Sequence, residues 1–274
     1  MQDKISVYGG TGFIGSNFIN LYPDRCVLVP RGERVPPTNT ILYFISTTHN
    51  YHVFDNLHKD VNTNLKVLLE VLECCKDRDV TINFVSSWFV YGNTPLPARE
   101  NSPCDPRGFY SITKRCAEQL VESYCKTFKK DYRILRLGNV YGVGDKGASK
   151  KKNALQYLVN NLKEDKTISL YHGGEFIRDY LHVIDTCRAI NIVMNIGEKC
   201  VYNIGSGHPY RFRDLIEYAI HKLNSKSKVL TTEPPDFHQL VQVKDMYLDV
   251  RKLKSLGFQP ELSIEEGMNL LCQN

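Results

Sequence analysis

The stretch Ile5-Ser6-Val7-Tyr8-Gly9-Gly10-Thr11-Gly12-Phe13-Ile14-Gly15 decides the fold of this chain. Its first four residues predict a buried strand, and three glycines in GxxGxxG spacing follow at once before an apolar stretch. Gly9 permits a tight turn, Gly12 lets the backbone approach a pyrophosphate, and Gly15 lets helix and strand pack closely. The stretch therefore predicts a dinucleotide site that includes Phe13 and Ile14. A glycine-rich turn without a ligand is the alternative.

Short apolar runs alternate with longer amphipathic stretches along the first half of the chain. The expected strands cover residues 5–8, 26–29, 41–45, 82–85 and 132–137. Apolar side chains recur at helical spacing over 61–75 and over about 111–128, so we expect a helix in each. This alternation is typical of a parallel sheet with crossover helices. We therefore expect an α/β protein with a Rossmann-type, doubly wound parallel sheet.

The remaining segments predict a second, smaller part of the molecule. A basic, glycine-containing loop at 144–152 precedes an expected helix at 154–163 and a strand near 168–171. We expect residues 1–150 to form the dinucleotide-binding domain, with later segments at about 176–205 returning to it. Residues 151–274 are expected to form mainly the substrate-binding lobe.

One connection within the expected sheet is unusually short. Only about ten residues join Val29 to Ile41, Pro36 and Pro37 among them, whereas a crossover helix with its turns needs roughly 10 to 12 residues. We therefore expect the second crossover to be abbreviated or missing.

Composition limits the class of protein. Of 274 residues, 42% are hydrophobic and 24% charged, and the formal charge of +5 is too small and scattered to indicate nucleic acid or a membrane surface as partner. The nine cysteines form no CxxC pair, so we expect neither a disulfide framework nor a metal site. Reduced thiols in the cytoplasm are the simplest interpretation.

The end of the second strand bears on which dinucleotide binds. An acidic residue there would bond the ribose 2′-hydroxyl of NAD, but this chain has Val29-Pro30-Arg31, with Arg34 close behind. An arginine suits a 2′-phosphate, so NADP(H) is favoured over NAD(H), with Arg31 and Arg34 as cofactor-binding residues. The alternative is that both arginines lie in a solvated loop.

A tyrosine and a lysine at i and i+4 form the candidate catalytic pair. Tyr110 and Lys114 would share one face of a helix, where the ammonium would lower the pKa of the phenol and make it a general acid or base. Ser87 lies 23 positions upstream, at the end of an expected strand, where its hydroxyl could bond a reacting carbonyl. A YxxxK match alone is weak, and the serine strengthens it.

With these motifs in place, the chain resembles the extended short-chain dehydrogenase/reductases, the group of nucleotide-sugar epimerases, dehydratases and ketoreductases. Besides the glycine turn, the SSxxVYG strand end and the YxxxK pair, the resemblance rests on residues 135–142, 176–185, 202–207 and 256–260. It implies that Ser87, Tyr110 and Lys114 are catalytic, that Tyr110 and Lys114 also bind the cofactor, and that Lys114 does so through the ribose. It further implies that Asn139 and Arg178 contact the substrate diphosphate. Each of these two has a structural alternative, an Arg–Asp pair in a turn for Arg178 and a plain turn residue for Asn139.

Two aromatic residues limit the reactions that we expect of this chain. In the 4,6-dehydratases of the group an Asp-Glu pair follows the catalytic hydroxyl, whereas here Trp88 and Phe89 stand at those positions and can shuttle no proton. Both could floor the sugar pocket or simply pack in the core. A 4-ketoreductase is slightly preferred, and a C4 epimerase that retains NAD is the alternative. The chain departs from the family pattern in two places: the second crossover is shortened, and residues 237–242 lack the arginine that family members often place near the substrate nucleotide.

A sensor or scaffold that binds the dinucleotide without catalysis is the rival from another class, disfavoured because Ser87, Tyr110 and Lys114 are all present. The two amphipathic helices and the family habit of pairing them predict a homodimer. His49 or Tyr51, after the third strand, could touch substrate. Three consecutive lysines, at 150–152, could cover substrate phosphates, although a solvated loop is the more common outcome.

Overall fold

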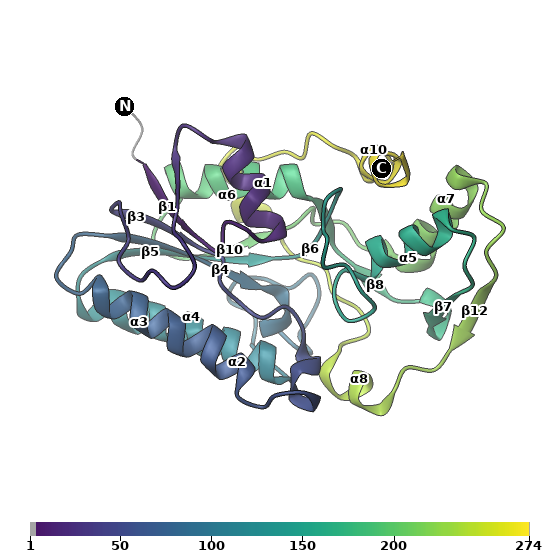
Figure 1. Ribbon diagram of the computed structural model, residues 1–274, viewed down its shortest axis with the longest axis horizontal. Helices are drawn as coiled ribbons and strands as arrows, with labels where there is room; N and C mark the ends of the chain where they lie inside the picture. The colour runs from purple at the N-terminus through teal and green to yellow at the C-terminus, as the bar shows by residue number, and fades with distance from the viewer. Residues whose placement is uncertain (1–3, 274) are drawn as a thin grey trace.

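A six-stranded, fully parallel sheet forms the centre of the molecule, of which the computed structural model describes residues 4–273 (Figure 1). In spatial order the strands are β10, β5, β4, β3, β1 and β2, and each pair of neighbours runs parallel. Their bounds are β1 (Ile5–Tyr8), β2 (Cys26–Leu28), β3 (Thr40–Tyr43), β4 (Thr81–Ser87), β5 (Asp131–Leu137) and β10 (Val201–Ile204). The expected Rossmann-type fold and its five strands are confirmed, although β3 ends before residue 45 and β4 continues beyond residue 85.

Helices cover both faces of this sheet. One face carries α1 (Phe13–Leu21) and α6 (Val183–Ile196) (Figure 1). The other face carries α4 (Phe109–Thr127) and a helix made of α2 (Lys59–Val61), the π-helical turn η2 (Asn62–Lys66) and α3 (Val67–Cys74). The two helices expected at 61–75 and 111–128 are therefore confirmed, each beginning two residues earlier than expected.

Successive residues of a strand pack into two separate apolar layers, one on each face of the sheet. In β3, Leu42 packs in the layer under α1 and α6, whereas its neighbours Ile41 and Tyr43 pack in the layer under α3 and α4. The same alternation in β4 sends Phe84 to one layer and Val85 to the other. Because both faces of a parallel sheet are covered, its strands are apolar on both sides, which is why they appear in the sequence as continuous hydrophobic runs.

The short second crossover is confirmed. No helix lies between β2 and β3, and the intervening segment returns to the start of β3 through turns and bends. Side chains of the core hold it in place: the Tyr8 hydroxyl donates to the carbonyl of Arg34 at 2.7 Å, and Ser6 and Thr38 share a hydrogen bond of 2.8 Å. As a result β2 is the edge strand, and the sheet has a single strand beyond β1 on that side.

A second lobe lies beyond the carboxyl ends of the strands (right in Figure 1). The helix expected at 154–163 and the strand near 168–171 are confirmed as α5 and β7, and a third apolar cluster joins α5, α7 and α10. The helices of this lobe are α5 (Ala154–Lys163), α7 (Phe212–Leu223), α8 (Asp236–Val241) and α10 (Ile264–Gln273), whereas α9 (Arg251–Ser255) packs against β10 of the central sheet. Three two-stranded sheets pair β6 (Asn139–Tyr141) with β9 (Tyr180–His182), β7 (Ile168–Tyr171) with β12 (Val229–Thr232), and β8 (Ile177–Arg178) with β11 (Tyr210–Arg211).

Short 3-10 turns complete the chain at η1 (Asn50–Phe54), η3 (Trp88–Val90) and η4 (His172–Gly174). The nine cysteines are all free thiols. None of the helices described between residues 4 and 273 combines the length and the apolar character that a membrane crossing requires.

Candidate active site

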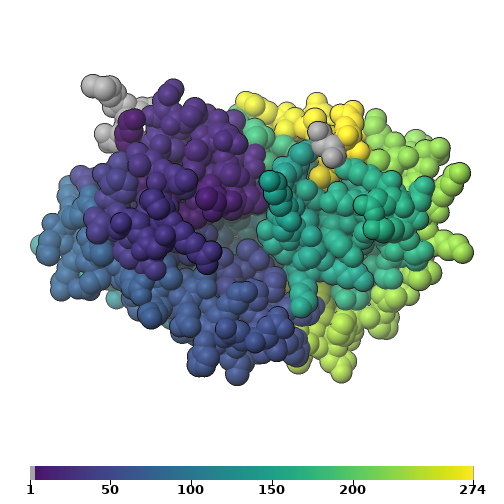
Figure 2. All heavy atoms as spheres, viewed as in Figure 1, coloured from purple at the N-terminus to yellow at the C-terminus, as the bar shows by residue number. Residues whose placement is uncertain are grey.

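A cleft of about 1180 Å³ opens between the carboxyl ends of the central strands and the second lobe (Figure 2). In open α/β sheets this is the end of the strands at which ligands bind. The glycine turn, the end of β4 and η1 line the cleft from the sheet side, and residues 150–155 and the region of α8 line it from the other. Both candidate regions of the sequence, for cofactor and for catalysis, therefore meet in one cavity.

The glycine turn has the backbone geometry that a bound pyrophosphate requires. Gly9 has a φ of +73°, and its carbonyl accepts the backbone N–H of Gly12 at 3.1 Å. A Cβ on Gly15 would lie only 2.6 Å from that same carbonyl oxygen, so no larger residue fits. Phe13 and Ile14 form the first turn of α1, whose backbone N–H groups have no acceptor within the helix. All five predicted residues of the turn line the cleft.

The two arginines after β2 are placed differently. Arg31 is exposed and lines the cleft beside the glycine turn. Arg34 is not among the residues that line it, and its Nε donates to a carboxylate oxygen of Glu70 at 2.7 Å. The structure thus brings Arg31 to the predicted cofactor site and ties the Arg34 side chain to α3.

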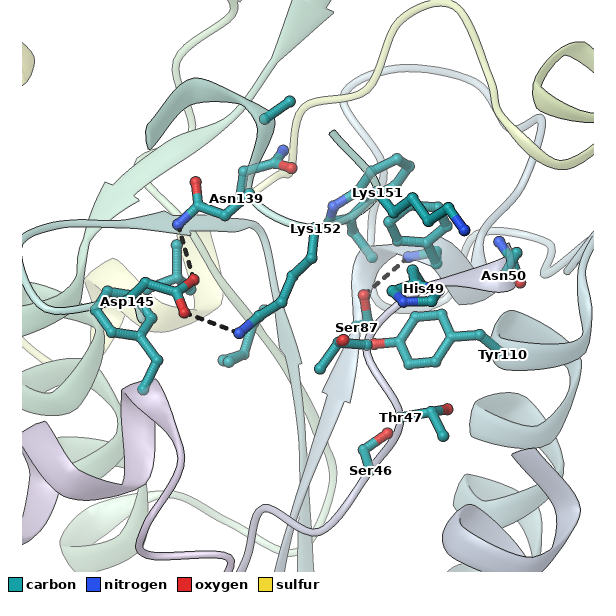
Figure 3. A pocket seen from close by; sticks show the side chains of 18 of the residues that line it. Ser46, Thr47, His49, Asn50, Ser87, Tyr110, Asn139, Asp145, Lys151 and Lys152 are labelled. Carbon is teal, nitrogen blue, oxygen red and sulfur yellow. Dashed lines mark hydrogen bonds and ion pairs between the residues drawn. The ribbon is translucent and has the colours of Figure 1, made fainter. Parts of the chain in front are cut away.

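Ser87 and Tyr110 meet at the centre of the cleft. Ser87 ends β4, and its Oγ accepts the backbone N–H of Phe89 at 3.4 Å, which fixes the side chain at the start of η3. Figure 3 shows the Ser87 and Tyr110 side chains facing each other. Burial raises the pKa of Tyr110 to about 12, against the opposing effect of its hydrogen bond with Ser87, and the charge of Asp60 raises it further. The phenol therefore carries its proton at neutral pH.

Lys114 lies one helical turn after Tyr110 on α4, as expected, but it acts differently from the expectation. Its Nζ donates to the carbonyl of Val85 at 2.6 Å and lies 4.1 Å from the ring centre of Phe84. Burial lowers the pKa of Lys114 to about 7, although the charge of Glu118 opposes the shift. The expected lowering of the Tyr110 pKa is wrong for this structure, because desolvation of the phenol outweighs any help from an ammonium that is itself desolvated.

A buried polar network beneath Tyr110 escaped the sequence analysis. Asn64 accepts the backbone N–H of Thr47 at 2.7 Å and donates to the hydroxyls of Thr47 and Thr113, each at 2.8 Å. Asp60, 1% exposed, accepts the Thr47 hydroxyl through one oxygen, and its other oxygen has no hydrogen-bond partner among the described residues. Two polar residues on the buried face of an amphipathic helix were the signal that could have revealed this network.

Arg178 is buried in the cleft wall, where its side chain is largely committed to the main chain. Its guanidinium donates to the carbonyls of Ile177, Lys244 and Val243 at 2.7, 2.5 and 2.9 Å. It also lies 5.3 Å from the ring centre of Trp88. Burial lowers the pKa of Arg178 to about 10. The arginine expected to contact the diphosphate thus fixes the segment before residue 245 and lines the cleft at the same time.

The other predicted substrate contacts line the same wall. Asn139 lines the cleft, and its Nδ2 donates to the carbonyl of Asp179 at 3.2 Å. Trp88 is 4% exposed and stacks on Phe89 with ring centres 4.0 Å apart. The Arg–Asp pair weighed for Arg178 does not form with Asp179, whose carboxylate instead accepts Ser206, Gly207 and Leu248.

The lysine-rich loop reaches across the cleft. Asp145 is buried and accepts Lys152 at 2.9 Å, which ties down the end of the loop (Figure 3). Lys151 lies 5.4 Å from the ring centre of Tyr51, on the opposite side. Lys150 lines the cleft with both of them. In residues 4–273, no three His, Cys, Asp or Glu side chains are grouped to hold a metal.

Comparisons with known proteins identify the family of the chain. Residues 38–205 match the NAD dependent epimerase/dehydratase family. A putative UDP-glucose 4-epimerase of Methanocaldococcus jannaschii is 28% identical over 214 residues, which cover 76% of this chain and 68% of that protein. The dTDP-4-dehydro-6-deoxyglucose reductase of Escherichia coli is 24% identical over 239 residues, covering 86% of this chain and 74% of the relative.

A solved structure shows the same fold along nearly the whole chain. The UDP-glucose 4-epimerase of Thermus thermophilus, determined in complex with NAD, superposes with a TM-score of 0.86 at 21% identity and covers 98% of each chain. The family match spans more than half of the sequence and includes Ser87, Tyr110 and Lys114. The chain therefore belongs to the NAD dependent epimerase/dehydratase family and is an NAD(P)-dependent enzyme of the extended short-chain dehydrogenase/reductase type.

Proposed function

We propose that this enzyme is a 4-ketoreductase that reduces a nucleotide-activated sugar at C4 with NADPH. The observation that carries the proposal is the meeting of the Ser87 and Tyr110 hydroxyls in the cleft that the glycine turn also lines. The stacked rings of Trp88 and Phe89 follow Ser87 directly and offer no acid or base for the elimination of water. This argues against a dehydratase and leaves reactions that need only hydride transfer and one proton.

The turn from Gly9 to Gly15 fits a dinucleotide. Glycine at residue 15 lets the turn and the start of α1 approach each other closely, where a Cβ would collide with the Gly9 carbonyl. Bound NADPH would supply the hydride. Ser87 would donate a hydrogen bond to the carbonyl oxygen of the sugar, and Tyr110 would transfer its proton to that oxygen as the ketone becomes a hydroxyl. Lys114 would hold the ribose of the cofactor.

The protonation state of Tyr110 supports the direction of reduction. A pKa raised to about 12 by burial keeps the phenol protonated at neutral pH, as a proton donor must be. The name of the Escherichia coli relative, a reductase of a 4-dehydro sugar, points the same way. The name of the Methanocaldococcus jannaschii relative supports the alternative, a C4 epimerase that retains NAD.

The preference for NADPH rests on Arg31. It lines the cleft beside the glycine turn, whereas Arg34 is paired with Glu70, so Arg31 is the arginine we assign to the 2′-phosphate. No carboxylate stands at the end of β2, where Val29 and Pro30 follow the strand. The ribose hydroxyl of NAD would therefore lack its usual acceptor at this position.

We also propose that the enzyme is a cytoplasmic homodimer. Exposed apolar side chains on the outer helices support the pairing of two copies through this face: Val61, Leu69, Phe109 and Ile112. The nine free thiols are typical of a reducing compartment. Sedimentation at micromolar concentration should show a dimer, and a monomer at all concentrations would remove this part of the proposal.

The test is turnover with a panel of nucleotide-linked 4-keto sugars and either NADPH or NADH, followed by cofactor absorbance and by chromatography of the sugars. Net consumption of NADPH with one substrate would establish the ketoreductase. Conversion of an unoxidised nucleotide sugar into its epimer without net consumption would establish the epimerase instead. Cofactor binding without any turnover would favour the non-catalytic sensor.

A further inference from the structure

His49, one of the two residues after the third strand that could touch substrate, lines the cleft and has no role in the reaction proposed above. It precedes η1 and lies, half-buried, beside Ser87 and Tyr110 (Figure 3). It comes from the segment that follows β3, whereas Ser87 ends β4 and Tyr110 begins α4. Three separate elements therefore bring polar side chains to one point of the cavity, and two of them carry the proposed proton transfer.

The hydrogen bonding of His49 fixes which ring nitrogen carries the proton. Nδ1 accepts the backbone N–H of Tyr51 at 3.2 Å, and so caps η1. A neutral imidazole that accepts at Nδ1 carries its proton on Nε2, and that nitrogen is then a donor. The ring of His52 packs on the His49 ring with centres 4.0 Å apart at 33°, which limits its rotation.

The surroundings keep the ring neutral. Burial lowers the pKa of His49 to about 4, and the nearby His52, Lys151 and Lys59 lower it in the same direction. At neutral pH the side chain is therefore an uncharged donor of a single hydrogen bond from Nε2. Such a group suits a sugar hydroxyl or carbonyl better than a phosphate, which is bound most strongly by charged donors.

We propose that His49 binds the sugar, its Nε2–H donating to an oxygen next to the carbon that reacts at Ser87 and Tyr110. This inference rests on the proposed function for the chemistry of the substrate. It assigns His49 to the sugar and not to the nucleotide, so its loss should weaken recognition of the sugar while leaving the parent nucleoside diphosphate and NADPH unaffected.

Two substitutions separate this role from the cap. In His49→Asn the side-chain oxygen can still accept the N–H of Tyr51, but nothing replaces the Nε2 donor. In His49→Gln the amide reaches the place of Nε2 and can donate, while the cap is weakened. If His49 binds the sugar, kcat/KM should fall about 10- to 100-fold in His49→Asn and clearly less in His49→Gln. His58→Asn, at an exposed residue outside the cleft, is the matched control and should behave as wild type.

A binding measurement makes the result independent of turnover. Calorimetry compares UDP-glucose, dTDP-glucose and GDP-mannose with UDP, dTDP and GDP on wild type and His49→Asn. We expect the nucleotide sugar that binds best to lose affinity by about tenfold and its diphosphate to lose none. Equal losses for both, or a larger defect in His49→Gln than in His49→Asn together with a lower melting temperature, would show that His49 only caps η1. Absence of ketone reduction with an intact sugar-binding defect would overturn the proposed reaction and leave this inference standing.

Discussion

The two ends of the cleft are built in different ways. At the proposed cofactor end, the phosphate-binding turn is one continuous segment, residues 9–15, in which backbone conformation and close packing decide the geometry. The proposed substrate end consists of side chains from remote segments, such as the Tyr51 hydroxyl and Nδ1 of His238, 2.8 Å apart across 187 positions of sequence. A single segment with strict steric needs is visible in a sequence, whereas a wall assembled from many segments is not.

The largest effect is expected from removing the hydroxyl of Tyr110, a change that leaves both ends of the cleft intact. Tyr110→Phe should lower kcat about 10²- to 10⁴-fold, since the general acid is lost while the shape of the cleft is kept. Fluorescence titration should show NADPH affinity within about twofold of wild type. Substantial turnover in this variant would mean that another group supplies the proton.

A methyl group at the glycine turn should break the cofactor end alone. In Gly15→Ala the new Cβ would lie 2.6 Å from the Gly9 carbonyl oxygen, so helix and turn must separate. We expect NADPH affinity to fall by more than about tenfold and stability by about 1–3 kcal/mol. Titration of NADPH and thermal melting measure the two effects. Ser16→Ala, on the same helix, adds no atom and serves as control; unchanged NADPH binding in Gly15→Ala would contradict the assignment of this turn.

Substitution of the two arginines after β2 tests which of them binds the 2′-phosphate of the cofactor. Arg31→Ala should weaken NADPH binding about five- to tenfold and leave NADH binding unchanged, because only NADPH carries the 2′-phosphate. Arg34→Ala is the matched comparison: its side chain binds Glu70, so it should leave both affinities unchanged. Equal losses of NADPH and NADH affinity in Arg31→Ala would remove the proposed preference.

The smallest effect is expected at the substrate end. Tyr51→Phe deletes the hydroxyl bonded to His238, and we expect KM for the sugar nucleotide to rise about two- to tenfold with kcat little changed. Steady-state kinetics at saturating NADPH measures this. A larger loss of NADPH affinity than of substrate affinity would show that the wall belongs to the cofactor end.

The pKa values of Tyr110 and Lys114 could not be predicted from the spacing of the motif. The YxxxK spacing placed Tyr110 and Lys114 on one face of α4, but it did not reveal that both side chains would be desolvated. Burial moves their pKa values in opposite directions, up for the phenol and down for the ammonium, since it disfavours the charged form of each. The burial that causes these shifts depends on the elements packed around the two side chains, and those elements come from different parts of the chain.

Other side chains also have partners that the sequence does not reveal. Asp60, Thr47 and Asn64 form a network only because α2 and η2 pack under the segment that follows β3. Arg34 lies near Arg31 in the sequence, yet its side chain turns to α3. Neither outcome follows from the residue types, because each depends on a partner far away in the chain.

By itself the sequence determined the parallel sheet, the glycine turn, the missing crossover helix and the placement of Tyr110 and Lys114 one turn apart on the same helix. These features rest on local sterics and on the periods of strand and helix, which a linear pattern records. Only the tertiary structure decided which arginine reaches the cleft, which groups are desolvated and where His49 points. These outcomes depend on which remote segments pack together. The free energies of burial and of charge pairing come from those contacts, and such contacts leave no periodic pattern in the sequence.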